Sequence, residues 1–309
     1  MIRTVSVENY LGEKLDLELT APEKSGLYIQ SITGLGSGDA SINITDMASN
    51  DGGVFNSARA QTRNITITLG MYEINTSESE WSIEKARRST YKYFPKKKPL
   101  TLYFETDDRS LYINGYVESN EVEIFEEREI STISILCPDP NFYKKSTSID
   151  QLAVVTDNLE FPYSNESLTE ELTEFGLISI DVPVTVIDYA GDVEIGILFR
   201  MRCRGHVEGL SIFNAETGET MSIDDSKLDS TALPGGISDG DTIEISTVRG
   251  NKYATIIREG NHYNILNALG MNPNWFQIHP KDNVFALTTT SGTGNVEIEI
   301  LYNEAYEGM

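Results

Sequence analysis

Few residues of this chain have the types and the spacing that catalysis or metal binding requires. Its three histidines, His206, His262 and His279, lie apart and form no HxH, HExxH or paired Cys–His pattern, so the sequence predicts no metal site. No GxSxG motif is present, although an α/β-type serine hydrolase needs that turn to expose its nucleophile. We interpret the histidines as ordinary surface or hydrogen-bonded side chains, and we predict no catalytic residue and no bound cofactor.

Two other groups offer atoms that could bind a ligand. The run from Gly34 to Asp39 reads GLGSGD, but it lacks the dinucleotide-binding spacing and precedes a strand-like alternation where a helix would be needed. We therefore predict a turn there. Acidic turns could supply oxygen ligands to calcium, but no EF-hand spacing is present, so we interpret these carboxylates as facing water. They are Asp224 with Asp225 and Asp239 with Asp241.

The charge balance is strongly acidic. Asp and Glu number 48 against 24 Lys and Arg, a formal net charge of −24. Nucleic-acid binding needs concentrated positive charge, so we predict no sequence-specific binding, whereas a passage through which DNA slides would suit this sign. The basic run Lys96–Lys98 is too short to change that. One acidic cluster could line an anion-repelling channel or be the solvated face of a hairpin. Its members are Glu118, Glu121, Glu123, Glu126, Glu127 and Glu129.

An aromatic pair, Trp275 and Phe276, lies in the segment NPNWFQI at the entry to a strand. An exposed tryptophan on a β-sandwich can stack on a sugar ring. We interpret the pair as buried at the edge of a core, and exposure of Trp275 would instead favour carbohydrate binding.

Most of the chain alternates apolar and polar residues with the period of a strand buried on one face. Residues 65–69 are a clear case, and residues 100–117 form a hairpin with a turn at 106–110. The pattern continues over 122–135 and stops at Pro138, because proline cannot remain in a central strand.

One segment has helical periodicity instead. Ser77 and Glu80 match a capping box, and Pro95 supplies a stop. Glutamates come early and cations late, which suits the helix dipole. We predict a single amphipathic helix packed on a sheet. Its buried face is expected to hold Ile83, Ala86, Thr90, Tyr91 and Phe94.

A change in composition divides the chain into two parts. The stretch 146–177 is polar and acidic, and from about residue 178 short strands recur between turn signals without a second strong helix, as in an antiparallel sandwich. We predict a domain over 1–145, an acidic linker or arm over 146–177, and a β-sandwich over 178–309. A length of 309 residues is enough for two such domains.

The two cysteines, Cys137 and Cys203, fall in different predicted domains. We interpret them as small buried apolar groups rather than a disulfide. The N-terminus (MIRTVSVENYLGEK) has no apolar run of signal-peptide length, and no segment reaches roughly 18 consecutive apolar residues. We therefore expect no secretion signal, no membrane insertion and synthesis in a reducing cytoplasm.

The order of these segments resembles the distal tail protein (Dit) family of long-tailed bacteriophages. In the first half the resemblance rests on a glycine-marked loop and strand (50–73), the helix (77–95) and paired strands ending in ILCPDPNFY (135–143). In the second half it rests on the segments 186–224, 238–256, 272–287 and 296–308. Together these regions cover most of 1–145 and 178–309.

The resemblance implies a mainly β protein with two domains. The first would be a tail-tube-like β-barrel or sandwich with one flanking helix, and the second a galectin-like antiparallel β-sandwich. Six copies would close into a ring whose lumen continues the tail tube. Their summed formal charge, six times −24 or −144, fits a conduit that does not bind DNA.

The resemblance also implies partners and a location. The expected partners are the other copies of a homo-hexamer, the tail tube protein, a tail-associated hub or tip protein, and receptor-binding or fibre proteins. The expected location is the baseplate at the distal tail tip of a virion, after assembly in the cytoplasm of a bacterial host.

Two other classes of function compete with this structural role. A carbohydrate-binding adhesin would act through the C-terminal β-sandwich. A cell-wall hydrolase would need two converging carboxylates with separated pKa values, and the sequence offers no such pair. We therefore predict a structural protein and not an enzyme, with the adhesin as the alternative.

Overall fold

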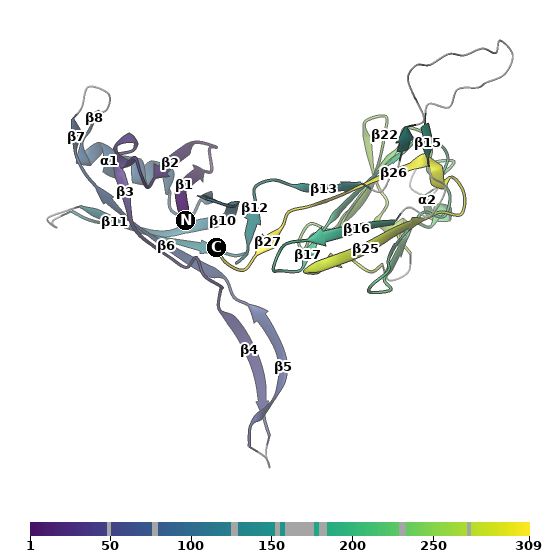
Figure 1. Ribbon diagram of the computed structural model, residues 1–309, viewed down its shortest axis with the longest axis horizontal. Coiled ribbons are helices and arrows are strands. Elements are labelled where there is room, and N and C mark those ends of the chain that lie inside the picture. Colours follow the sequence, from purple (N-terminus) through teal and green to yellow (C-terminus); the bar gives the residue numbers. More distant parts are fainter. Residues whose placement is uncertain are drawn as a thin grey trace, which may run out of the picture. The chain divides into compact units, whose positions relative to one another are not determined.

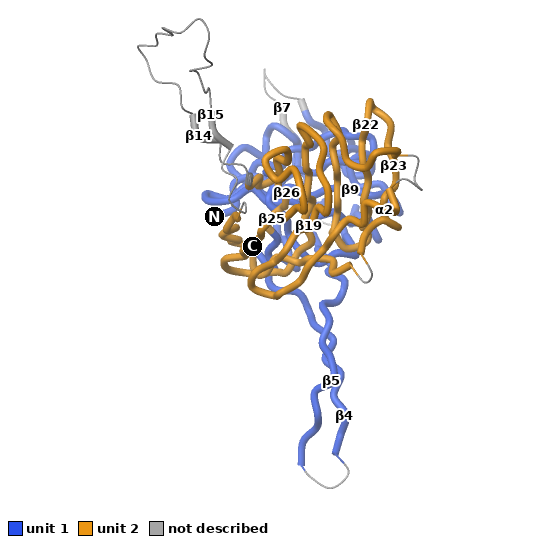
Figure 2. Tube along the Cα trace, turned by 90° about the vertical axis from the view of Figure 1, so that its right-hand side faces the viewer, with its two compact units in different colours: residues 1–146, 305–309 blue, residues 147–304 orange. Residues whose placement is uncertain are grey.

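The computed structural model describes residues 1–47, 51–75, 80–124, 129–151, 155–157, 176–178, 184–228, 233–270 and 273–309 (Figure 1). The chain divides into two compact units, unit 1 (1–146 with 305–309) and unit 2 (147–304) (Figure 2). The predicted mainly β class is confirmed, and none of the sheets formed by the described residues closes into a barrel. The galectin-like character of the second domain and the domain bounds 1–145, 146–177 and 178–309 stay predictions.

Unit 1 is built on a nine-stranded sheet whose main path runs β2-β1-β9-β10-β11-β6-β3, while β12 pairs with β10 and β27. Its strand pairs are antiparallel. The strands are β1 (Ile2–Asn9), β2 (Lys14–Glu18), β3 (Leu27–Thr33), β6 (Arg63–Met71), β9 (Pro99–Thr106), β10 (Ser110–Glu123), β11 (Ile130–Cys137), β12 (Phe142–Lys144) and β27 (Ala305–Tyr306). A short 3-10 helix (Pro22–Lys24) precedes β3, and β7 (Ile74–Asn75) pairs with β8 (Glu80–Trp81).

The alternation found in the sequence matches this sheet. The apolar positions of β6 point into the core, and Ile65, Ile67 and Leu69 are fully buried. The predicted hairpin over 100–117 is formed by β9 and β10, which pair with Leu102 opposite Ile113. Because one face packs on the core and the other does not, the period of two was readable in the sequence.

The predicted amphipathic helix is α1 (Ile83–Tyr93), and it stops before Pro95 as expected. The predicted capping box is wrong. Ser77 lies outside the described residues, and Glu80 belongs to β8. The helix begins after Ser82, whose Oγ accepts a hydrogen bond of 3.2 Å from the backbone N–H of Lys85, as a serine N-cap does.

The buried face of α1 is narrower than predicted. Ala86, Thr90 and Phe94 are buried against the core of unit 1. Tyr91, which was assigned to the same face, is 49% exposed. Successive residues of a helix are turned by about 100°, so Tyr91 cannot share the direction of Thr90.

Unit 2 contains two larger antiparallel sheets. The six-stranded sheet has the order β13 (Ser148–Gln151), β26 (Val296–Tyr302), β18 (Leu198–Cys203), β21 (Thr242–Ser246), β22 (Tyr253–Arg258) and β23 (Asn261–Asn264). The four-stranded sheet has the order β16 (Val184–Tyr189), β25 (Lys281–Thr288), β19 (Ser211–Asn214) and β20 (Thr220–Ser222). Two small pairs are β14 (Val155–Asp157) with β15 (Gly176–Ile178) and β17 (Ile195–Gly196) with β24 (Gln277–Ile278). Within the described part of unit 2, the helical pieces are α2 (Asp225–Leu228) and two 3-10 turns, Leu266–Ala268 and Thr293–Asn295.

Three phenylalanines join the two sheets of unit 2. The rings of Phe199, on β18, and Phe285, on β25, pack edge-to-face with each other and with Phe276, with centroids 5.6 to 5.7 Å apart. All three are fully buried. Edge-to-face packing of this kind is the arrangement that aromatic quadrupoles favour, so the core of unit 2 lies between the sheets, as in a sandwich.

The segment 146–177 was predicted as a linker or arm. Within it, Ser148–Gln151 form β13 at the edge of the six-stranded sheet, and β14 pairs with β15. Residues 152–154 and 158–175 lie outside the described part of the chain.

The two cysteines are free and buried, one in each unit, as predicted. Among the described residues, no helix combines the length and the apolar character needed to cross a membrane.

Candidate interaction surface

The three histidines do not come together, and two of them have local partners. His206 Nε2 lies 3.1 Å from Glu208 Oε1, and this hydrogen bond raises the pKa of His206. His279 Nδ1 lies 2.9 Å from Glu194 Oε1, and His262 is exposed on β23. Within the described residues, no group of three or more His, Cys, Asp or Glu side chains could hold a metal ion.

The acidic turns of unit 2 have structural roles. Asp241 was predicted to face water, which is wrong, because it is only 1% exposed and forms an ion pair of 2.7 Å with Arg258. Asp225 accepts a hydrogen bond of 2.7 Å from the N–H of Gly209. Asp224 pairs with Lys227 at 3.3 Å. These contacts fix turns and loops, while Oδ1 of Asp225 is buried without a hydrogen-bond partner.

The aromatic pair divides between core and surface. Phe276 is fully buried, as predicted. Trp275 is only half-buried, and the Nζ of Lys252 lies 5.1 Å from the centroid of its ring. This cation–π contact occupies a ring face on which a sugar would stack.

The predicted glutamate cluster is only partly a cluster. Glu118, Glu121 and Glu123 lie exposed along β10. Glu129 instead forms a partly buried ion pair of 3.6 Å with Arg87, while Glu126 and Glu127 lie outside the described residues. The exposed run Lys96–Lys98 follows α1, and Lys98 lies over the ring of Tyr10.

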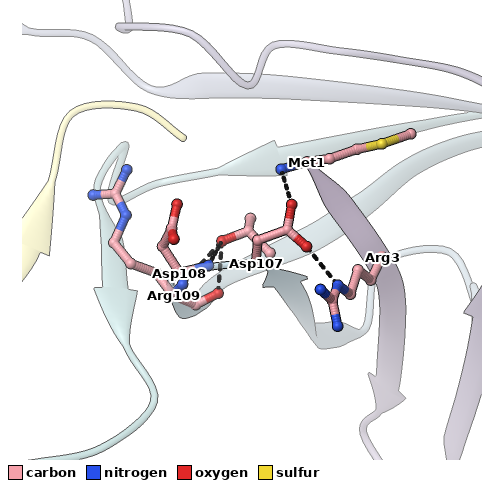
Figure 3. A network of polar contacts seen from close by, with 6 residues as sticks. Met1, Arg3, Asp107, Asp108 and Arg109 are labelled. Carbon is pink, nitrogen blue, oxygen red and sulfur yellow. Dashed lines mark hydrogen bonds and ion pairs between the residues drawn. The ribbon is translucent and has the colours of Figure 1, made fainter.

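A polar network fixes the turn between β9 and β10 (Figure 3). The carboxylate of Asp107 accepts hydrogen bonds from the amino group of Met1 at 2.8 Å and from Arg3 Nε at 2.5 Å. These two contacts, the amino group first, lower the pKa of Asp107. The network ties β1 to the turn.

The most unusual feature of the surface is an arm formed by β4 (Ala40–Asp46) and β5 (Gly53–Ala60). The two strands pair with each other as a separate two-stranded sheet. Figure 1 shows this ribbon leaving the sheet of unit 1. An isolated two-stranded ribbon has little stability of its own in water.

One face of the arm is apolar. Ile44 lies opposite Phe55, and Ile42 lies opposite Ala58, and opposite residues of an antiparallel pair share a face. The exposed fractions are 59% for Ile42, 57% for Ile44 and 63% for Phe55. An apolar face of this kind, open to water, is a candidate surface for contact with another molecule.

The other face of the arm is polar but nearly uncharged. Asn43 lies opposite Ser57, and Ser41 opposite Arg59. Val54, which lies opposite Thr45, is an apolar residue on this polar face. The Oγ1 of Thr45 accepts a hydrogen bond of 2.6 Å from Asn56 Nδ2. The arm is therefore amphipathic although it stands outside the core.

The root of the arm, residues 34–39, is the turn predicted from GLGSGD, and it joins β3 to β4. Gly34 has a φ of +86°, and a Cβ there would lie 2.2 Å from the carbonyl oxygen of Asn64. The conformation and the close backbone approach both require glycine.

Arg63 holds this root from within unit 1. Its side chain is nearly buried, 5% exposed for the residue, and donates to the carbonyl oxygens of Gly34 at 2.7 Å, Pro140 at 2.6 Å, Gly36 and Glu307. The guanidinium also lies 4.7 Å from the centroid of the Phe142 ring. Burial lowers the pKa of Arg63, but an arginine remains charged at neutral pH.

Comparison with known proteins gives a match in structure. No protein-family model matches the sequence, and no curated protein matches it either. SPP1 Dit, a protein of the hub adsorption apparatus in phages that infect Gram-positive bacteria, superposes with a TM-score of 0.61 at 12% identity, over 97% of this chain and 98% of that one. The chain has the fold of a phage distal tail protein. Two structures of the phage P2 baseplate in its activated conformation, with Ca and with Sr, are similar at TM-scores of 0.48, identities of 14% and 15% and coverage of at least 97% of each chain.

Within this Dit fold, the arm is the feature that sequence reasoning missed. A signal was present, because the segment 40–60 alternates apolar and polar residues around an Asn-Asp-Gly-Gly turn, as a hairpin does. Alternation does not reveal whether the apolar side of a hairpin meets its own core or the surface of another molecule.

Proposed function

We propose that this chain is a structural protein of a phage tail, which forms a hexameric ring at the distal end and joins the tail tube to the baseplate. The observation that carries the proposal is the free apolar face of the arm on a chain with the Dit fold. A ribbon with one apolar face is stable when a neighbour covers that face. In a ring, the next copy supplies such a neighbour at every position.

The covered side chains contribute enough free energy to matter. Full burial of an Ile or Phe side chain is worth about 1.5 to 3 kcal/mol. Ile42, Ile44 and Phe55 are 57 to 63% exposed in the single chain. Covering them therefore contributes about 1 to 2 kcal/mol each at every subunit contact.

The remaining partners follow from the same proposal. One face of the ring meets the tail tube protein, and the other meets a tail-associated hub or tip protein. Unit 2 provides the platform for receptor-binding or fibre proteins. The role is structural rather than catalytic, and the location is the tail tip of the virion.

The test is native mass spectrometry of the full chain, with negative-stain imaging of the same sample. We expect a sixfold assembly with a central hole. The double variant Ile44→Ser/Phe55→Ser removes about 3 kcal/mol per contact, so the concentration needed for assembly should rise at least about 100-fold. The matched control Asn43→Ser/Ser57→Thr changes the opposite face of the same arm and should assemble normally.

Two results would contradict the proposal. Rings that form equally well in the apolar-face variant would show that the arm does not join the subunits. A chain that stays monomeric at high concentration and binds a cell-wall glycan would favour the adhesin. The Lys252 contact on Trp275 disfavours that alternative, because it covers the best stacking surface.

A further inference from the structure

The direction of the arm depends on its root. Among the described strands, β4 pairs with β5 alone, so the ribbon has no lateral support of its own. It is attached on one side through residues 34–39 and on the other through the two residues that precede β6. Whatever fixes these short connections also fixes where the arm points.

A segment distant in sequence closes over this root. Residues 305–309, here called the return segment, follow the last strand of unit 2 and belong to unit 1. Its first residues form β27, which pairs with β12 so that Tyr306 lies opposite Phe142. Ala305 and Tyr306 are buried, and the guanidinium of Arg109 lies 4.5 Å from the centroid of the Tyr306 ring.

The last residues of the return segment bind the root directly. The N–H of Met309 donates a hydrogen bond of 3.0 Å to the carbonyl oxygen of Leu35. The side chains of Leu35 and Met309 pack against the same core. At Gly308, an added Cβ would lie 3.1 Å from the carbonyl carbon of Gly36 and from the N–H nitrogen of Ser37. The two backbones are therefore in close contact.

Arg63 joins the two pieces. Its guanidinium donates to carbonyl oxygens of the root, at Gly34 and Gly36, and to that of Glu307 in the return segment. These hydrogen-bond acceptors are neutral carbonyl oxygens. A planar guanidinium can hold several of them at fixed angles, which a single ammonium cannot do.

We propose that the return segment is a strap that sets the direction of the arm, with Arg63 as its positioning residue. The strap is a property of the single chain. Its importance for assembly rests on the proposed function, because an arm that meets a neighbour must point in one direction before contact. Pre-ordering of this kind removes an entropic cost from association.

The test measures the arm in the single chain. Nitroxide labels are placed through Ser57→Cys on the arm and Glu121→Cys on β10, both exposed. The native thiols are buried, and burial raises the pKa of Cys137 to about 11 and of Cys203 to about 12, so they label slowly at neutral pH. Double electron–electron resonance then gives the distribution of label distances.

Gly308→Val forces the strap away from the root, and deletion of residues 307–309 removes the part of the strap that contacts the root and Arg63. We expect the distance distribution to widen at least twofold in both variants. The control Gly36→Ala adds a Cβ at the same root in open space, and should keep the narrow distribution. If the deletion variant does not fold, the distance distribution of Gly308→Val alone tests the strap.

An unchanged distribution in Gly308→Val, with circular dichroism showing both units folded, overturns the strap. So does equal widening in Gly36→Ala, because the root would then be loose for reasons unrelated to the return segment. The measurement is made at concentrations where native mass spectrometry shows monomers. A chain that never forms rings can therefore still confirm or overturn the strap.

Discussion

Replacement of Arg63 by methionine should destabilise unit 1 and leave unit 2 unchanged. The variant loses four hydrogen bonds from a charged donor, which at about 1.5 kcal/mol each sum to about 6 kcal/mol. Part of this loss in free energy is offset, because methionine has no charge to desolvate and the carbonyls left without a donor lie near the surface. That offset is about 3 kcal/mol. The expected loss in the free energy of unfolding is about 3 kcal/mol.

Each unit contains one of the two tryptophans, Trp81 in unit 1 and Trp275 in unit 2. In a Trp275→Phe background, urea unfolding followed by fluorescence therefore reports on unit 1, where Trp81 packs against the core. Arg63→Lys serves as the second variant. It keeps the charge, and we expect a loss of about 2 kcal/mol because lysine cannot reach four carbonyls in one plane.

A loss of less than about 1 kcal/mol in the free energy of unfolding of Arg63→Met would refute the role of Arg63 in holding the root. The burial of the guanidinium would then cancel its hydrogen bonds, and Arg63 would not be needed to hold the root. A full rescue by Arg63→Lys would also refute it, since charge alone would then suffice.

Three further predictions concern the core, the root and pH. Phe285→Ala should lower the stability of unit 2 by about 3 to 5 kcal/mol, measured by unfolding followed at the tryptophan of that unit, with unit 1 unchanged. Gly34→Ala should destabilise unit 1 by more than about 1 kcal/mol, because its φ is +86° and the added Cβ meets a backbone oxygen; denaturant unfolding measures this, and an unchanged midpoint contradicts it. The pKa of Asp107 is lowered by the amino group of Met1 and by Arg3, so its stabilising contribution is present above the unfolded-state pKa, about 3.9, and is lost as pH falls through the lower folded-state value. An NMR titration of this carboxyl should show that lowered value, and Asp107→Asn should remove its share of the acid sensitivity of unit 1.

The sheets were readable from the sequence because burial on one face repeats every two residues. The strands around Ile67 and Ile113 follow this rule. The end of β11 at Cys137 was also predictable, because Pro138 cannot continue a central strand. The start of α1 was predicted wrongly because three serines, Ser77, Ser79 and Ser82, precede it, and only the local backbone decides which one caps the helix. Tertiary pairing of β7 with β8 places Glu80 in a strand, so the cap falls at Ser82.

The features that define the candidate surface were harder to predict from the sequence. Arg63 shares the buried face of β6 with Ile65, Ile67 and Leu69. The period of two predicts this inward direction of the side chain, but it does not predict the four distant carbonyl oxygens that the guanidinium binds. The return segment meets Arg63 across 244 positions of sequence, at Glu307. Contacts between segments so far apart leave no periodic trace, so they appear only in the folded structure.

The composition of the arm has a consequence for how the protein responds to salt. The two strands of the arm contain only Asp46 and Arg59 as charged residues, with Asp51 between the strands, whereas the whole chain has a net charge of −24. Free copies therefore repel one another at long range, while the contact made by the apolar face is independent of charge. Added salt screens the repulsion and leaves the contact intact. Assembly should accordingly become easier as ionic strength rises, which is opposite to the behaviour of an interface built from complementary charges, and low salt should keep newly made chains apart and soluble.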